Sequence, residues 1–124
     1  LLPHNSDAAA EDLRVQLSEH FGKRLGVVIN DSFGRPWRRG TVGVALGAAG
    51  ISALNDQRGR LDLSGYALQV TETALADEVA SAASLLMGQA DEANPVVLVS
   101  GLPNADVSIP ASTLIRPAEE DLFR

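Results

Sequence analysis

An acid and several arginines lie close together in the segment DSFGRPWRRG, residues 31–40. A carboxylate that follows a short apolar run, as Asp31 does, can hold a metal ion or simply cap a turn. Guanidinium groups can bind phosphate or carboxylate in a bidentate manner, but they also occur on solvated loops that carry an aromatic anchor. The combination favours phosphoryl chemistry, with anions held by Arg35, Arg38 and Arg39.

A second candidate group is Glu72-Thr73, at the start of a predicted helix. Acids in a first helical turn usually stabilise the helix dipole, and from the residues alone we favour that interpretation. The alternative is that both oxygens complete a hard-cation site with Asp31. Sequence spacing alone does not bring the two segments together.

The loop GRLDLSGY, residues 59–66, contains an arginine, an acid and a phenol. We favour a hairpin turn with a surface Arg–Asp pair, which contributes little to stability, over substrate binding. The glycines fit neither the dinucleotide fingerprint nor a Walker loop. His4 and His20 have no nucleophile or ligand-like residue beside them, so we expect no catalytic protein nucleophile.

The elements that must position these residues follow from periodicity and turn signals. Ser6 and Thr71 are the predicted N-caps of two helices. Residues 31–40 are a predicted loop, and residues 47–50 a flexible bend. Strands and helices alternate without a regular βαβ rhythm, so we predict an α+β fold with a mixed sheet and a few packed helices. We expect helices over residues 6–21 and 71–87, and strands over residues 25–29, 41–46, 66–70 and 95–100.

The two predicted helices carry recognisable packing faces. In the first, apolar residues recur every four positions and Gly22 ends the helix. The second has an apolar stripe and a separate small-residue face that permits close packing. The stripe consists of Leu75, Val79, Ala82 and Leu86, and the small-residue face of Ala76, Ala80 and Ala83.

Composition limits the function classes. The net charge of −6 disfavours nonspecific nucleic-acid binding. The absence of cysteine excludes disulfides and thiolate chemistry and fits a cytoplasmic location. Without an apolar run near 18 residues or a signal-peptide pattern, we expect no membrane association. The chain starts at Leu1 rather than Met, which favours the interior and end of something longer.

The motif order is more specific than any single motif. DSFGRPWRRG, GVALGAAGI, the RGRxDLxGY loop, VTETALADEVASAA and PVVLVSG follow one another along the chain. This pattern resembles the family of coenzyme F-420:L-glutamate ligases over roughly residues 1–124. The resemblance implies the C-terminal half of a gamma-glutamyl ligase domain, without its N-terminal half, in an α+β fold that forms intertwined homodimers.

The resemblance also implies a reaction. Such ligases attach L-glutamate through γ-linkages to a deazaflavin, using GTP to activate the acceptor carboxylate as an acyl phosphate. Two divalent ions, Mg or Mn, and a monovalent cation such as K are the implied cofactors. Metals and guanidiniums would neutralise the charge between triphosphate and carboxylate.

By motif, Asp31 would bind the first metal, Glu72 would share it and Thr73 would face the second. Gly34 matches a nucleotide contact. Arg35, Arg38 and Arg39 become candidates for phosphate or substrate carboxylate, and Asp62 and Tyr66 lie in a strong motif of unassigned role. Three alternatives stay open: a non-catalytic interaction or assembly module, a fragment that is inactive by itself, and an unrelated phosphate-binding protein.

Overall fold

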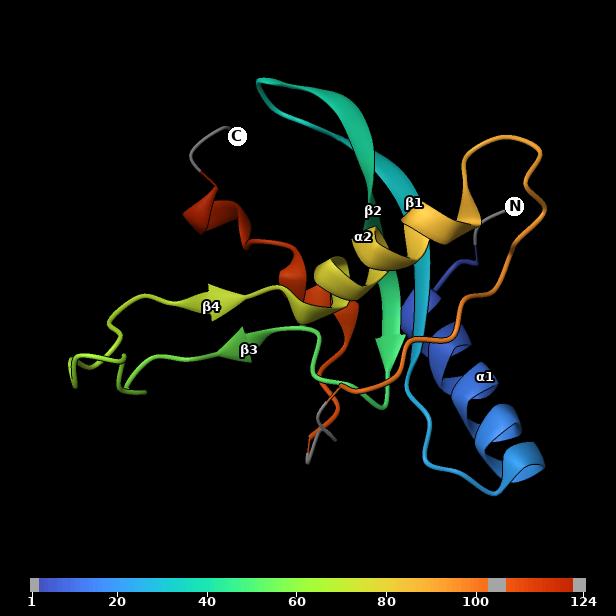
Figure 1. The fold of residues 1–124 in the computed structure, drawn as a ribbon, viewed down its shortest axis with the longest axis horizontal. Helices are drawn as coiled ribbons and strands as arrows, with labels where there is room; N and C mark the ends of the chain where they lie inside the picture. The colour runs from blue at the N-terminus through green and yellow to red at the C-terminus, as the bar shows by residue number, and fades with distance from the viewer. Residues whose placement is uncertain (1–2, 103–106, 122–124) are drawn as a thin grey trace.

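The computed structural model describes residues 3–102 and 107–121. Its central element is an antiparallel hairpin of β1 (Val27–Arg35) and β2 (Arg38–Ala49). Helices α1 (Ser6–Phe21) and α2 (Leu75–Met87) pack against it, with α2 crossing in front of the hairpin and α1 behind it (Figure 1). The combination confirms the predicted α+β class.

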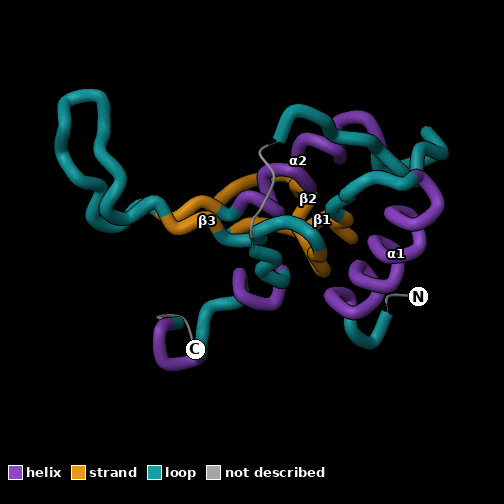
Figure 2. Tube along the Cα trace, turned by 90° about the horizontal axis from the view of Figure 1, so that it is seen from below, coloured by secondary structure: helices purple, strands orange, loops and turns teal. Residues whose placement is uncertain are grey.

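A second, two-stranded antiparallel sheet joins β3 (Asn55–Asp56) and β4 (Glu72–Thr73). Figure 2 shows the loop between these strands extending away from the helices and the hairpin. Two short 3-10 turns follow near the C-terminus, η1 (Ala111–Leu114) and η2 (Ala118–Glu120). None of the helices within the described ranges is long and apolar enough to span a bilayer.

A β-bulge in β2 allows this strand to pack against both helices, one on each face. Ile29 pairs with Gly47 and Asn30 with Ala45, so Leu46 is the extra residue on β2. Side chains four positions apart in a strand normally point to one face. Here a Cβ at Gly43 would meet Ala80 and Ser84 of α2, whereas a Cβ at Gly47 would meet Ser6 and Asp7 of α1. The bulge therefore places the helices on opposite faces of the hairpin.

The core consists of small residues. Among the described residues, every buried apolar side chain is an alanine: Ala10, Ala48, Ala49, Ala53, Ala76, Ala80 and Ala111. The predicted small-residue face of α2 is therefore the face that packs, through Ala76 and Ala80. The predicted apolar stripe of that helix is wrong in its second half, because Ala82 and Leu86 are exposed. Close backbone approach, rather than large side chains, defines this core.

Several predicted boundaries need correction. The segment predicted as a loop over residues 31–40 continues β1 and begins β2, separated only by a turn at Pro36-Trp37. The predicted bend at residues 47–50 is buried strand up to Ala49, and only Gly50 (φ 70°) turns. Tertiary pairing overrides the turn propensity of Asp, Ser and Gly in these segments.

Two predicted strands are absent from the described residues. Residues 66–70 form only an isolated bridge, between Leu61 and Ala67, and residues 95–100 have no paired strand.

The predicted helix over residues 71–87 begins later, at Leu75, because Glu72 and Thr73 pair with β3. At the other helix Asn5, rather than Ser6, is the N-cap, and its Oδ1 accepts a 2.9 Å hydrogen bond from the Ala8 N–H. Gly22 ends this helix as predicted, with φ 59°.

Candidate active site

The hairpin carries the first group of predicted site residues. Asp31 lies opposite Val44 in the middle of β1 and is exposed, and its Oδ1 accepts a 2.7 Å hydrogen bond from the Ser32 N–H. Gly34 lies opposite Thr41, with open space where a Cβ would stand. Both residues are thus accessible on a regular strand rather than on a loop.

The three arginines lie at the hairpin tip, where the two strands join. Arg35 and Arg38 are the last paired residues before the turn. Arg35 Nη2 donates to the Arg39 carbonyl over 3.3 Å, which braces the tip, and Arg35 Nε is buried without a hydrogen-bond partner in the described structure. Arg38 and Arg39 are exposed. A concentrated positive charge results at the end of the hairpin.

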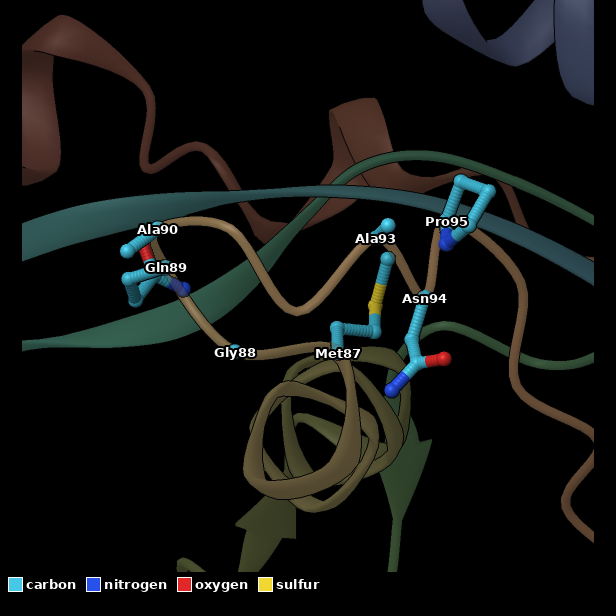
Figure 3. A pocket seen from close by; sticks show the side chains of 7 residues that line it. All are labelled: Met87, Gly88, Gln89, Ala90, Ala93, Asn94 and Pro95. Carbon is cyan, nitrogen blue, oxygen red and sulfur yellow. The ribbon is translucent and has the colours of Figure 1, made fainter.

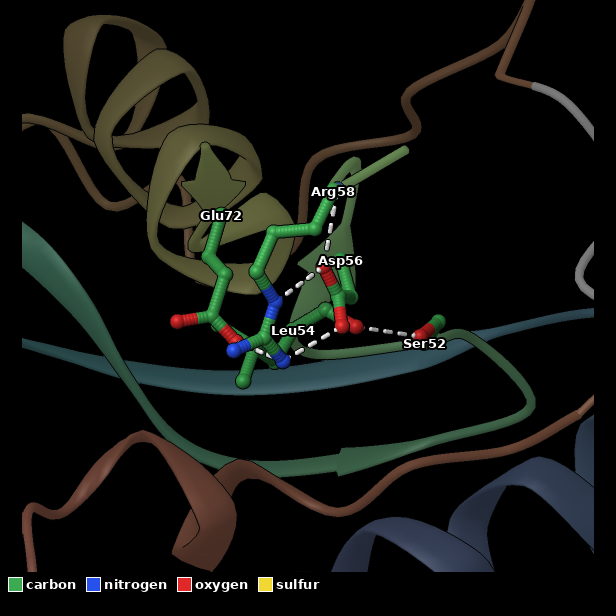
Figure 4. A network of polar contacts seen from close by, with 5 residues as sticks. All are labelled: Ser52, Leu54, Asp56, Arg58 and Glu72. Atoms are coloured by element: carbon green, nitrogen blue, oxygen red, sulfur yellow. Dashed lines mark hydrogen bonds and ion pairs between the residues drawn. The ribbon is translucent and has the colours of Figure 1, made fainter. Parts of the chain in front are cut away.

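The small sheet carries the second group. Asp56 and Glu72 are directly opposite each other, an arrangement that is destabilising for two like charges. The Arg58 guanidinium bridges them: Nε donates to Asp56 Oδ1 over 2.8 Å, and Nη2 lies 2.5 Å from Asp56 Oδ2 and 3.3 Å from Glu72 Oε1 (Figure 4). The hydrogen bonds from the Arg58 side chain and backbone lower the pKa of Asp56 to about 2. Arg58 therefore reduces the repulsion between the two carboxylates, and the three side chains together keep a net charge of −1.

Thr73 follows Glu72 on the same short strand. Its Oγ1 accepts a 3.4 Å hydrogen bond from Gln57 Nε2, and its backbone pairs with Asn55. The first helical turn of α2 begins two residues later, so Glu72 and Thr73 precede the helix and are not part of its first turn. The helix-dipole interpretation of Glu72 is thus corrected, since Asp77 and Glu78 take that position.

Asp62 and Tyr66 lie together in the turn between β3 and β4. Asp62 Oδ1 accepts hydrogen bonds from the backbone N–H groups of Ser64, over 2.8 Å, and Tyr66, over 2.9 Å. The Tyr66 side chain is exposed. These bonds fit the interpretation of a structured turn, and the carboxylate of Asp62 is the group that organises it.

The structure unites some of the predicted residues and not others. Glu72 and Thr73 are neighbours. Asp56 and Arg58, which lie beside them, were not among the residues predicted from the sequence. The only available signal was an acid two residues before an arginine in a polar segment. Asp31 is on the hairpin, away from the β3–β4 sheet (Figure 1). Within the described residues, no three His, Cys, Asp or Glu side chains are gathered closely enough to hold a metal.

The donor chemistry nevertheless suits a hard divalent ion. Mg and Mn prefer oxygen ligands, which the carboxylates of Asp31 and Glu72 and the hydroxyl of Thr73 supply. In the structure Glu72 is paired with a guanidinium and the Thr73 oxygen with an amide. The metal-ligand assignment for these three residues stays a prediction.

A pocket lies elsewhere, between the end of α2 and the loop that follows it. Figure 3 shows the Met87 side chain extending toward Ala93, with Pro95 on the same loop. Asn94 Nδ2 closes one side by donating to the Leu86 carbonyl over 3.1 Å. No acid or base lines this pocket, so it offers nothing for phosphoryl transfer.

Similarity to known proteins identifies the family to which this chain belongs. The F420-0:Gamma-glutamyl ligase family model matches residues 1–101, and the chain belongs to this family. A relative named coenzyme F420:L-glutamate ligase from Methanocaldococcus jannaschii is 49% identical over 100% of this chain and 50% of its own length. Ligases of the same name from Methanococcus maripaludis and Methanothermobacter thermautotrophicus are each 46% identical over 99% of the chain and 50% of their length. The chain spans about half the length of these curated relatives.

Proposed function

We propose that this chain acts within a coenzyme F420:L-glutamate ligase that joins L-glutamate to a deazaflavin acceptor. The observation that supports this proposal best is the 49% identity to a ligase of that name along the entire chain. The matched region includes the hairpin and the segment from β3 to β4, which together carry all the candidate site residues.

The proposed reaction has two steps. An acceptor carboxylate oxygen attacks the γ-phosphorus of GTP, so that GDP leaves and an acyl phosphate forms. The glutamate amine then attacks the acyl carbon, inorganic phosphate leaves, and the amine loses a proton to give the amide. Neither step needs a covalent protein nucleophile, which suits a chain without cysteine. The product extends the acceptor by one glutamate, which is joined through its amine to the activated carboxyl.

Each candidate residue has a role in this proposal. Asp31, Glu72 and Thr73 would hold Mg or Mn, which neutralises triphosphate charge when bound, as a monovalent K ion would also do. Gly34 would admit the nucleotide close to the backbone. Arg35, Arg38 and Arg39 would bind phosphate or the acceptor carboxylate. Because Arg58 pairs with Glu72, a metal at Glu72 would have to replace that guanidinium.

An assembly role is the second candidate, and exposed apolar surface favours it. Leu63, Val70, Leu85, Val96 and Leu98 each keep more than four-fifths of their surface exposed. A contiguous patch of exposed apolar side chains typically marks a protein interface, and this candidate function requires that some of these five form one. Under this alternative the chain would serve as a docking module, and a cytoplasmic homodimer is the assembly that we propose.

The decisive experiment uses a ligase that spans the full length of the relatives and includes this chain. Glutamate addition to F420-0 is followed by mass spectrometry with GTP and Mn, and with each omitted. We expect no product when GTP or Mn is left out. We expect the Asp31→Asn variant to fold normally and to add glutamate at least about a hundredfold more slowly, as after the loss of one electrostatic group. Asp12→Asn, an exposed acid on α1, is the matched control. Wild-type turnover by the Asp31 variant would exclude the metal assignment, and turnover without GTP would exclude the phosphoryl mechanism.

A further inference from the structure

Trp37 adopts a conformation that its residue type disfavours. It is the second residue of the two-residue turn between paired Arg35 and Arg38, and its φ is 56°. This left-handed region suits glycine or asparagine at that turn position, and a bulky residue there is an outlier. At the other left-handed position of the tip the chain has Gly40, with φ 83°.

Packing does not explain this choice of residue. Trp37 keeps 87% of its surface exposed, so the indole contributes little to the core. The hairpin tip, where Trp37 lies, projects beyond both helices (Figure 1). Backbone strain retained at an exposed aromatic residue is typical of functional sites.

The surroundings of the ring indicate what it could bind. Three arginines lie within two residues of Trp37, on a chain whose net charge is −6. The tip is thus a local cationic patch on an acidic protein. An indole stacks on flat aromatic rings, and adjacent guanidiniums hold anionic groups. The complementary ligand is a flat heteroaromatic ring with an anionic tail.

We propose that the hairpin tip, residues 35–40, binds the deazaflavin acceptor, with its fused rings stacked on Trp37 and its anionic tail held by Arg38 and Arg39. This inference rests on the proposed function. GTP shares the chemistry of a flat ring with an anionic tail. A three-ring system covers an indole more fully than a purine does, so the assignment is to the deazaflavin.

The first experiment uses Trp37 as its own reporter, because it is the only tryptophan of the chain. F420-0 and GTP are titrated separately into the chain, and quenching of indole emission is recorded, with N-acetyltryptophanamide as the optical control. We expect saturable quenching by F420-0 that exceeds the control, and none by GTP. The double variant Arg38→Ala, Arg39→Ala should weaken F420-0 binding about tenfold or more. Quenching by GTP alone, or by neither ligand, overturns the proposal.

The second experiment separates binding from folding in the full-length ligase. Trp37→Gly removes the ring and relieves the turn. We expect the Kd for F420-0, measured by fluorescence anisotropy of the deazaflavin, to rise about tenfold, the loss expected of one aromatic stack, while Tm does not fall. Phe33→Ala, at another exposed aromatic residue of the hairpin, is the matched control and should leave Kd unchanged.

The outcomes also distinguish this inference from the proposed function. An active ligase in which Trp37→Gly binds F420-0 with the wild-type Kd overturns the tip site alone. A protein that binds F420-0 through Trp37 but never adds glutamate supports the tip site and overturns the ligase proposal. A lower Tm with unchanged Kd would assign Trp37 a structural role and overturn the inference.

Discussion

Asp7 of α1 and Asp77 of α2 bind the backbone N–H groups of Ala48 and Ala45 on β2, over 2.9 Å and 2.8 Å. These two amides lie on either side of the bulged Leu46. Amides three positions apart point to opposite edges of a regular strand, and the extra residue turns both toward the edge that β1 does not pair. Each helix thus begins with a carboxylate that satisfies one of the two amides.

Asp7 is predicted to be the most costly surface acid to remove. Its Oδ1 also accepts from the Ala111 N–H over 2.8 Å, and its Oδ2 from the Ser112 N–H over 3.1 Å. Asp7→Ala leaves three backbone donors without this partner, and we expect a loss of about 1–3 kcal/mol in the free energy of unfolding. Urea denaturation measures it, with Asp12→Ala on the same helix as control. Equal stability of the two variants would contradict the assigned role.

We predict that the Asp7 carboxylate makes the stability of the fold depend on pH in the acidic range. Burial would raise the pKa of Asp7, but hydrogen bonds from Ala48, Ser112 and Ala111 outweigh burial and lower the pKa below the ordinary value of an aspartate. A lowered folded-state pKa contributes stability that is present above the unfolded pKa and is lost as pH falls through the folded pKa. We expect the stability gap between wild type and Asp7→Asn to be constant near pH 6 and to shrink below about pH 4. A gap that widens on acidification would disprove this linkage.

Gly43 is predicted to tolerate no side chain. A Cβ there would meet the Ala80 backbone and the Ser84 hydroxyl, at distances that real Cβ atoms do not show. The hydroxyl of Ser81 also donates to the Gly43 carbonyl over 2.7 Å, so α2 is fixed in place. Gly43→Ala should cost about 1–3 kcal/mol by thermal or urea unfolding, as overpacking does. Gly34→Ala on β1, which meets no atom within 4 Å, should change the unfolding free energy much less.

Arg58 is predicted to hold the small sheet together mainly by charge. Arg58→Ala leaves Asp56 and Glu72 opposite each other without a counter-charge. We expect faster hydrogen exchange at the Gln57 amide, which donates to the Thr71 carbonyl over 2.9 Å next to this pair. Because the groups are exposed, salt should reduce the difference between wild type and variant. Asp56→Asn in the Arg58→Ala background removes the repulsion and should restore slower exchange.

The sequence was sufficient for features that depend on local chemistry. The fold class, the end of α1 at Gly22 and the small-residue face of α2 follow from periodicity and from the conformational freedom of glycine. A turn around Asp62 was also predicted, but with a surface Arg–Asp pair. In the structure the Asp62 carboxylate accepts from the backbone N–H groups of Ser64 and Tyr66, as short polar side chains in turns commonly do.

Features that depend on pairing were not predictable in this way. Residues 95–100 have the composition of a strand, but a strand exists only where a partner completes the hydrogen-bond ladder, and none does among the described residues. Asp31 was predicted at the mouth of a loop because Asp, Ser and Gly follow the apolar run. Pairing with β2 keeps that segment extended. The bridge from Arg58 to Glu72 joins residues fourteen positions apart, a relationship that no local pattern encodes.

The alanine core has a calorimetric consequence. The heat-capacity increment of unfolding scales with the apolar surface that unfolding exposes, and methyl groups bury little surface each. With many large apolar side chains already in contact with water, this chain should unfold with a smaller increment per residue than the usual 12–15 cal/mol/K. Its stability should therefore vary little with temperature. If a partner covers those side chains, unfolding of the complex exposes more apolar surface. The heat-capacity increment should then be larger, and the free energy of unfolding should curve more strongly with temperature.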